Sequence, residues 1–439
     1  MNFLKDSIKK LYFKYLLAAF GSALITSIYS VVDMAMVGQY HGPNGTAALA
    51  VVAPVWNIVY SLGLLMGIGG SVLFSMLRAE KEEFEKSNQY FTVAIIGALC
   101  LSLFSWLGLG LFEKPILEFF GADQILLDLS IIYLKPILFV LPLFLLNQML
   151  AAFLRNDGNP TLATIGVLMG GLFNMFGDYF FVFTCDMGIF GAGLATAIGS
   201  LISFLILMSH FISKKNTLKF VKVENFYLKL KKIIVTGFST FFIDVAMGIL
   251  TILFNRQIMK YLGSNALAIY GPIIQISTFV QCCAYSVGQA AQPILSSNYG
   301  AKQFNRIREC LRYALYVSAA FSIFWFTVSV LFPNFFISLF MQANKEILAM
   351  APSIVRVYAI SFLMLPFNIF STYYFQSVLK PKESFVVSVV RGCVLSGALI
   401  LILPILFSGS AIWWTMPITE LIVMLYAIRQ MRKSICELN

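Results

Sequence analysis

The chain has 439 residues, of which 59% are hydrophobic and only 12% charged, and its mean hydropathy is +0.84. Soluble globular proteins carry about 25% charged residues, so the composition excludes a soluble protein and indicates an integral membrane protein. The net charge of +11 is no sign of nucleic-acid binding, because the charges are confined to segments between hydrophobic runs. We expect membrane lipid to surround the chain and no nucleic acid to bind it.

About twelve hydrophobic runs of ~20 residues or more follow one another, the length that a helix needs to cross a bilayer. The fold class expected is all-α: a polytopic membrane protein of about 12 transmembrane helices. Prolines inside these runs predict bends, because each removes a backbone hydrogen bond. The prolines are Pro54, Pro142, Pro272, Pro293 and Pro366, and the runs lie near 12–38, 46–77, 90–112, 125–154, 161–184, 188–213, 233–259, 266–297, 310–333, 347–379, 384–407 and 410–430.

The start of the chain, MNFLKDSIKKLYFK, is basic and amphipathic, but the long apolar segment after it has no small-residue cleavage site. We therefore expect the first span to serve as an uncleaved signal. The remaining Lys and Arg residues concentrate in the even-numbered loops and after the last span. By the positive-inside rule, both termini are expected to be cytoplasmic and the protein integral to the plasma (inner) membrane.

The chain contains an internal repeat. GTAALAVVAP (45–54) and GSNALAIYGP (263–272) share Gly, Ala, Leu, Ala and Pro at an offset of 218 residues. This duplication predicts an amino-terminal six-helix bundle over 1–213, a basic linker over 214–232 and a carboxy-terminal six-helix bundle over 233–439. The linker is expected either to lie on anionic lipid as an amphipathic helix or to be a solvated positive loop.

Two acidic residues and an amide stand in apolar segments of the first half. Asn174 and Asp178 are four residues apart, so a helix places both on one face, and Asp33 lies in the first span. A carboxylate in hydrocarbon costs roughly 3 kcal/mol or more, so it usually faces a cation, a partner or water. The residues predict a cation or proton site; the alternative is that each acid is neutral and hydrogen-bonded within the helix packing.

Four local motifs resemble those of the multidrug and toxic-compound extrusion (MATE) transporters over nearly the full length of the chain. They are YSVVDMAMVGQYHG in the first span, FLRNDGNPTLATIG leading into GLFNMFGDYFFVF, GQAAQPILSSNYGAK (288–302), and SVVRGCVLSGALILILP in the eleventh span. The third motif is the most specific of the four. One position departs from the family: many members have a proline about four turns before the first-helix Asp, where this chain has Ala18.

The resemblance implies a cation site in the first bundle, formed by Asp33, Asn174, Asp178 and Thr196. Oxygen ligands suit Na⁺, at Asp33, Asn174 and Asp178, and two close carboxylates suit a proton equally well. Na⁺ and H⁺ therefore both remain open as the coupling ion, and no other cofactor is expected. Without the usual proline at Ala18, a mechanism that bends the first helix there is in doubt.

The second half offers candidate substrate or coupling residues. Asp244 lies near the middle of its span, where it either neutralises a cationic substrate or is hydrogen-bonded to a neighbour such as Gln281. Arg391 stands near one end of its span, where a structural role is favoured. Arg356 and Glu420 are interpreted either as a buried pair or as separate anchors.

The resemblance implies a secondary active multidrug antiporter that exports small lipophilic, often cationic molecules by alternating access, driven by a Na⁺ or H⁺ gradient. The alternative is a flippase for lipid-linked or polysaccharide intermediates, which is expected to need several basic residues in its cavity; Arg356 and Arg391 are few. No metal motif, phosphate-binding loop or nucleophile–base spacing indicates an enzyme. A chain with two bundles of its own is expected to work as a monomer.

Overall fold

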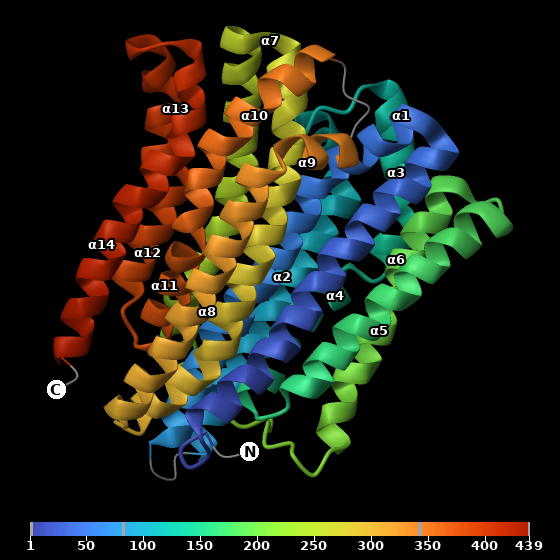
Figure 1. The fold of residues 1–439 in the computed structure, drawn as a ribbon. Helices are drawn as coiled ribbons and strands as arrows, with labels where there is room; N and C mark the ends of the chain where they lie inside the picture. The colour runs from blue at the N-terminus through green and yellow to red at the C-terminus, as the bar shows by residue number, and fades with distance from the viewer. Residues whose placement is uncertain (1–2, 81–83, 341–344, 438–439) are drawn as a thin grey trace. The chain divides into compact units, whose positions relative to one another are not determined.

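The computed structural model describes residues 3–80, 84–340 and 345–437, and these residues form helices and connecting turns without a strand (Figure 1). The helices of the first half are α1 (Ile8–Ala79), α2 (Phe84–Phe119), α3 (Gln124–Leu138), α4 (Leu141–Asn156), α5 (Pro160–Tyr179), η1 (Phe180–Thr184), α6 (Gly188–Met208) and η2 (Ser209–Ile212). Those of the second half are α7 (Phe226–Gly300), α8 (Phe304–Leu331), α9 (Pro333–Phe340), α10 (Lys345–Ala359), η3 (Ile360–Leu363), α11 (Leu365–Ser377), α12 (Pro381–Val389), η4 (Val390–Val394), α13 (Leu395–Leu406), η5 (Gly409–Trp414) and α14 (Thr415–Glu437).

Within the described residues, 11 helices are long and apolar enough to cross a membrane. A twelfth span results if α3 and α4, which meet at an angle of 60°, are taken as one broken crossing. The break falls at Phe139 and Val140, and Pro142 lies in the first turn of α4, where its missing N–H leaves no helical hydrogen bond unmade. The prediction of an all-α membrane protein with about 12 transmembrane helices is confirmed.

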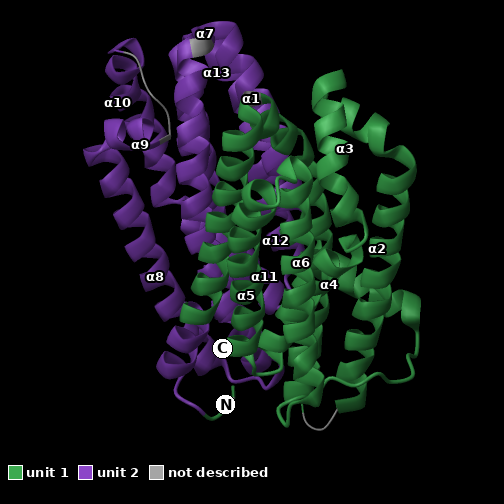
Figure 2. Ribbon diagram, turned by 90° about the vertical axis from the view of Figure 1, so that its right-hand side faces the viewer, with its two compact units in different colours: residues 1–5, 17–241 green, residues 6–16, 242–439 purple. Residues whose placement is uncertain are grey.

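The chain forms two compact units, coloured separately in Figure 2. Unit 1 contains residues 1–5 and 17–241, and unit 2 contains residues 6–16 and 242–439. These boundaries differ from those expected at 213 and 233, because the first turns of α7 pack within unit 1. There, a Cβ on Gly237 would lie 2.1 Å from the Leu65 carbonyl oxygen, so glycine permits the two backbones to touch.

The internal repeat is present in the backbone at an offset of 221 residues rather than 218. Gly42 (φ 65°, ψ −151°) and Gly263 (φ 78°, ψ −173°) interrupt α1 and α7 in the same left-handed conformation, which favours glycine. After each glycine comes a helix of 36 residues, Asn44–Ala79 or Asn265–Gly300. The offset of 218 had paired Gly45 with Gly263 by residue type, but the kink lies at Gly42.

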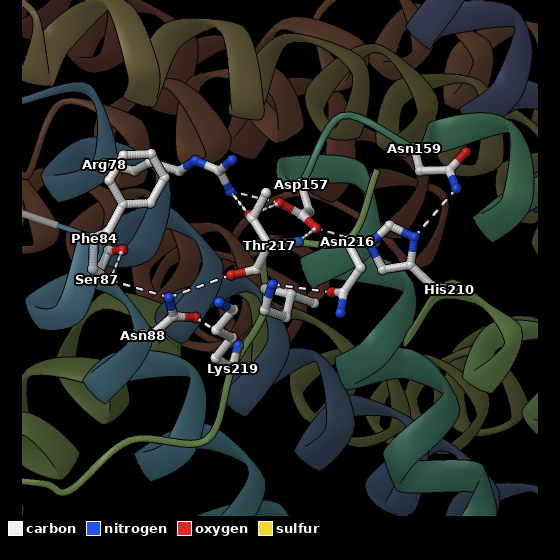
Figure 3. A network of polar contacts seen from close by, with 11 residues as sticks. Arg78, Phe84, Ser87, Asn88, Asp157, Asn159, His210, Asn216, Thr217 and Lys219 are labelled. Atoms are coloured by element: carbon white, nitrogen blue, oxygen red, sulfur yellow. Dashed lines mark hydrogen bonds and ion pairs between the residues drawn. The ribbon is translucent and has the colours of Figure 1, made fainter. Parts of the chain in front are cut away.

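The first part of the linker is not a helix, and its charged side chains are exposed although its backbone is bound to unit 1. Residues 214–225 run without helix, and buried side chains of unit 1 bind their backbone (Figure 3). The Thr217 backbone amide donates to Asp157 Oδ2 over 2.9 Å, and the Lys219 amide donates to Asn88 Oδ1 over 2.8 Å. The second part of the expected linker, from Phe226, is already the start of α7.

Asp157 holds this linker contact together. Its carboxylate also accepts a hydrogen bond from His210 Nε2 over 2.7 Å and forms an ion pair with Arg78. Burial of the carboxylate, the largest single influence, raises its pKa. Hydrogen bonds from His210 and Thr217 together with the charge of Arg78 outweigh that effect, so the pKa of Asp157 lies below its usual value. The carboxylate is thus held ionised and anchors the linker to unit 1.

We expect Asp157→Asn to lower the free energy of unfolding by about 3 kcal/mol, because it leaves the partners of a buried ion pair without a counterion. Since folding depresses the pKa of Asp157, the carboxylate stabilises the fold above its unfolded pKa of about 3.9. That contribution is lost as the pH falls through the lower folded value. The unfolding temperature of the purified variant should therefore lie furthest below that of the wild type near pH 7. The difference should shrink progressively below pH ~4. A constant difference across that range would contradict this assignment.

Candidate functional site

Four helices of unit 1 bring polar side chains together in a largely apolar interior. Asn174 on α5 donates through Nδ2 to Thr196 Oγ1 on α6 over 2.9 Å. The Tyr133 hydroxyl on α3 donates to Asp33 Oδ2 on α1 over 3.0 Å, and it also lies within hydrogen-bonding reach of Thr196. Asp178, one turn after Asn174, lies near enough to Asp33 for the two charges to interact. The four residues that the sequence singled out in this half therefore belong to one cluster.

Small residues create the close helix approach that positions this cluster. A Cβ on Gly170 would lie 2.6 Å from the Gly199 carbonyl oxygen, and one on Gly177 would lie 2.9 Å from the Ala195 Cβ. Close contact between α5 and α6 through small residues is the usual packing mode in membranes, and it brings Asn174 onto its partner helix. Directly after Asp178, α5 passes into the π-helical turn η1, a feature frequent at functional sites.

Of these residues, Asp178 has the least favourable surroundings for a charged side chain. Its side chain is fully buried, and neither carboxylate oxygen has a hydrogen-bond partner among the described residues. Asp33 Oδ1 and Asn174 Oδ1 are likewise buried without a partner in that part of the chain. An unpaired buried carboxylate is costly unless a proton or a cation neutralises it. The cluster therefore has the chemistry to bind either one.

Tyr133 is the member of this cluster that sequence reasoning missed. Its side chain is 3% exposed and connects Asp33 with Thr196. Nothing in the local sequence distinguishes it from the other tyrosines of the chain, which has 19 in all. Its role follows only from the packing of α3 on α6, where a Cβ on Gly193 would lie 2.2 Å from the Tyr133 carbonyl oxygen.

We expect Gly193→Ala to push α3 away from α6 and to break the Tyr133–Asp33 hydrogen bond. Overpacking of this kind costs about 1–3 kcal/mol of stability, and transport should fall with the loss of the hydrogen bond. Gly108→Ala is the matched control, because a Cβ there would have no neighbour within 4 Å. Unfolding temperature and transport rate of both purified variants test this; equal behaviour of the two would show that the α3–α6 contact does not position the cluster.

In unit 2, Arg391 and Glu420 form a buried ion pair. Arg391 Nε donates to Glu420 Oε1 over 2.7 Å, and Asn368 Nδ2 donates to Glu420 Oε2 over 2.6 Å. Glu420 is fully buried and Arg391 is 4% exposed. The expected alternative of an Arg356–Glu420 pair is wrong, because Arg356 is exposed and donates to the Val330 carbonyl oxygen. Arg391 sits in the π-helical segment η4, and its partner Glu420 lies on α14.

Asp244 lies on α7 in unit 2. The Tyr285 hydroxyl donates to Asp244 Oδ1 over 3.1 Å, so the hydrogen bond comes from a tyrosine rather than from Gln281. Asp244 Oδ2 is buried and has no hydrogen-bond partner among the described residues.

At Ala18, the position that the sequence singled out in the first span, α1 remains helical. The Ala18 carbonyl oxygen accepts hydrogen bonds from Thr164 Oγ1 at 2.7 Å and from Ser22 Oγ at 3.1 Å. The helix is thus held by side chains of α5 and of its own next turn at this position.

Comparison with known proteins connects both units to one family. The MatE family model matches the chain twice, at residues 18–180 and 238–402, so the second match begins 220 and ends 222 residues after the first. This spacing agrees with the offset of 221 in the backbone. Together the two matches cover most of the chain; the first lies in unit 1, and the second lies in unit 2 except for residues 238–241.

Similar proteins include the "Multidrug export protein MepA" of Staphylococcus saprophyticus, 24% identical over 92% of this chain and 89% of that protein. The "Probable multidrug resistance protein YoeA" of Bacillus subtilis is 24% identical over 78% of this chain and 75% of its own length. A solved structure described as an outward-facing multidrug resistance MATE family transporter superimposes with a TM-score of 0.88 at 19% identity, covering 99% of this chain and 98% of that chain. With its two family matches and this shared fold, the chain belongs to the MatE family.

Proposed function

We propose that this chain is a secondary active multidrug antiporter that exports lipophilic, often cationic compounds, driven by a Na⁺ or H⁺ gradient. The observation that carries the proposal is Asp178, a fully buried carboxylate without a hydrogen-bond partner in the described part of unit 1. Asp33, Asn174 and Thr196 lie around it and supply the oxygen atoms for a cation or a proton relay. Family membership and the names of the multidrug export relatives support the same reading.

Coupling follows from alternating access. If cation binding at Asp33 and Asp178 favours one state of the transporter and substrate binding favours the other, the two ligands are linked by a free energy, and a cation gradient drives export. Asp244 is proposed to assist in the second half, because it has a buried oxygen to offer a cationic substrate. Both termini are proposed to be cytoplasmic and the monomer to be the working unit.

A cavity of about 610 Å³ in unit 2 supports lipophilic compounds as the substrate class. It is lined mainly by apolar side chains, among them Phe407, Trp413 and Trp414. Cavities of this volume hold drug-sized molecules, and aromatic walls bind flat cations through stacking and cation–π contacts.

The flippase alternative is not favoured. An anionic headgroup would require free basic side chains, but Glu420 neutralises Arg391, and Arg356 is bound to a backbone carbonyl. Two similar proteins matched along most of their length are named a multidrug export protein and a probable multidrug resistance protein.

Ethidium efflux from a drug-sensitive bacterial host tests the proposal, with Na⁺ and proton gradients imposed separately. The wild type should export dye under one of the two gradients, and that gradient identifies the coupling ion. A wild type that is present in the membrane but exports no dye under either gradient would contradict the multidrug assignment.

A further inference from the structure

A concentration of positive charge lies between α6 and α7 in unit 1. Residues 214–232, called the basic strap below, contain seven lysines and one acidic residue, Glu224, so their net charge is +6. One lysine, Lys229, donates to the Glu224 carbonyl oxygen, and the other six are exposed. The exposed lysines are Lys214, Lys215, Lys219, Lys222, Lys231 and Lys232.

The basic strap is held to unit 1 through its backbone rather than through its lysines (Figure 3). The Lys219 amide donates to Asn88 Oδ1 over 2.8 Å, and Asn88 Nδ2 donates to the Thr217 carbonyl oxygen over 3.3 Å. Between these two residues, Leu218 is 2% exposed and packs into the interior. The charged side chains therefore extend from a backbone whose position is fixed.

The contacts with α2 place the basic strap at the edge of the hydrocarbon core. α2 has no charged residue between Lys86 and Glu113, a run of 26 residues that is about 39 Å long at ~1.5 Å per residue. A hydrocarbon core is about 30 Å thick, so a few residues at each end of the run reach the headgroups. Asn88 is near the start of this run, and Thr92, one turn later, accepts a hydrogen bond from the Val221 amide over 3.2 Å. The strap therefore crosses α2 close to the level of the lipid headgroups.

Large apolar side chains are exposed among these lysines. Phe220 is 66% exposed, Tyr227 is 79% exposed, and Ile212, which directly precedes Ser213 and the strap, is 90% exposed. Lysines beside exposed aromatic and aliphatic side chains are typical of segments that lie in a membrane interface. An acidic protein or a free phosphate would match the charge alone. A phospholipid matches both the charge and the apolar side chains.

The negative charges near the basic strap are too few to cancel it. Asp157, which binds the strap backbone, has a fully buried side chain and is already paired with Arg78. The connection between α1 and α2, residues 80–86, has a net charge of −2. Together with the strap, this leaves a net charge of +4 at this end of unit 1.

We propose that the basic strap is a docking surface for anionic phospholipids of the leaflet that borders it. The exposed lysines bind the lipid phosphates, and Phe220 and Tyr227 contact the upper parts of the acyl chains. Each lysine near an anionic membrane surface strengthens binding by about fivefold. Because the backbone is already fixed, lipid binding does not have to order a free loop. The surface holds unit 1 to that leaflet whichever ion and substrate the transporter uses.

Native mass spectrometry of the purified full chain, titrated in detergent with phosphatidylglycerol, tests this surface by giving a Kd for each bound lipid. Lys219→Gln combined with Lys222→Gln should raise the Kd of the tightest-bound lipid by about tenfold or more, since two lysines are removed. Lys114→Gln combined with Lys135→Gln is the matched control, because it removes two exposed lysines of unit 1 outside the strap. This control should bind phosphatidylglycerol as the wild type does.

A further variant, Asn88→Leu, tests the fixed backbone. It keeps every lysine and removes both hydrogen bonds between Asn88 and the strap. Its Kd for phosphatidylglycerol should rise by about threefold or more, because the loosened strap must then be ordered on binding. The lysine variant keeps the test valid if Asn88→Leu does not fold. Phosphatidylcholine, which has no net charge, and glycerol phosphate, which has no acyl chain, should both bind the wild type weakly.

Weaker phosphatidylglycerol binding in the strap variants, with wild-type binding in the control, supports the surface. Equal weakening in the two lysine pairs would show that net charge alone attracts the lipid and would overturn the strap as a docking surface. Wild-type affinity in a folded Asn88→Leu would overturn the role of the fixed backbone. A wild type that binds phosphatidylcholine equally well, or from which glycerol phosphate displaces the lipid, would overturn the proposed ligand. Dye efflux is measured separately, so failure here leaves the proposed function standing.

Discussion

Cells expressing Asp178→Asn should lose gradient-driven dye efflux, although the variant keeps the size and polarity of the side chain. Removing one charged member of a buried site costs about 2–5 kcal/mol, so cation affinity should fall by more than about tenfold. An amide side chain also takes up no proton, so the site can no longer bind and release one during the transport cycle. The measurement is the rate of ethidium efflux at equal membrane content of the variant and the wild type.

The control for this experiment is Asp128→Asn, an exposed acidic residue of α3 in the same unit. It should export dye as the wild type does. If Asp178→Asn exports dye as fast as the wild type under the same gradient, the cluster around Asp178 does not couple transport, and Asp244 in unit 2 becomes the carboxylate to examine.

Removal of Glu420 should produce the largest loss of stability in unit 2. Glu420→Ala leaves the Arg391 guanidinium buried and unpaired and deprives Asn368 of its acceptor, so unfolding should become easier by about 3–5 kcal/mol. The double variant Arg391→Met with Glu420→Leu should lose much less, because it leaves no uncompensated charge in the interior. Thermal unfolding of the purified single and double variants measures the difference.

For this second prediction, Glu309→Ala on the exposed side of α8 is the control and should unfold as the wild type does. A double variant less stable than Glu420→Ala would show that the pair stabilises unit 2 by more than mutual neutralisation. An unaffected Glu420→Ala would show that Arg391 finds another partner or reaches water.

Composition and hydrophobic run length were sufficient to predict the membrane fold. Runs of about 20 apolar residues have few alternatives to a spanning helix, since a bilayer offers the backbone no other hydrogen-bond partner. The effect of proline was less predictable. Pro142 and Pro366 stand just inside new helices after a break, whereas Pro54, Pro272 and Pro293 lie inside continuous helices. A proline removes one backbone hydrogen bond, and the packing around it determines whether the helix bends or breaks there.

The repeat and the linker show where residue identity alone was misleading. GTAALAVVAP and GSNALAIYGP align best at 218, but the backbone repeats at 221, because conformation at Gly42 and Gly263 rather than similarity of residues sets the register. The linker appeared to be solvated because of its lysines. Its backbone amides nevertheless bind Asp157 and Asn88, whose positions depend on packing that is distant in sequence.

The candidate site was predictable in its acidic and amide members but not in their surroundings. Asp33, Asn174 and Asp178 are conspicuous because polar atoms are expensive in hydrocarbon. Tyr133 has no such distinguishing feature, since a hydroxyl in a membrane helix often serves only to bind a neighbouring helix. The pairing of Glu420 with Arg391 instead of Arg356 likewise depends on which arginine the helix packing buries, which the sequence does not reveal.

The most direct test of the account is cation movement coupled to dye transport by the purified protein in proteoliposomes. An inward dye gradient, imposed without any ion gradient, should drive the coupling cation out of the vesicle lumen, and lumenal Na⁺ and pH are recorded at the same time. The account predicts that one of the two ions moves against the dye in the wild type and that neither moves in Asp178→Asn. Dye that crosses the membrane through the wild-type protein without any movement of Na⁺ or protons would contradict it.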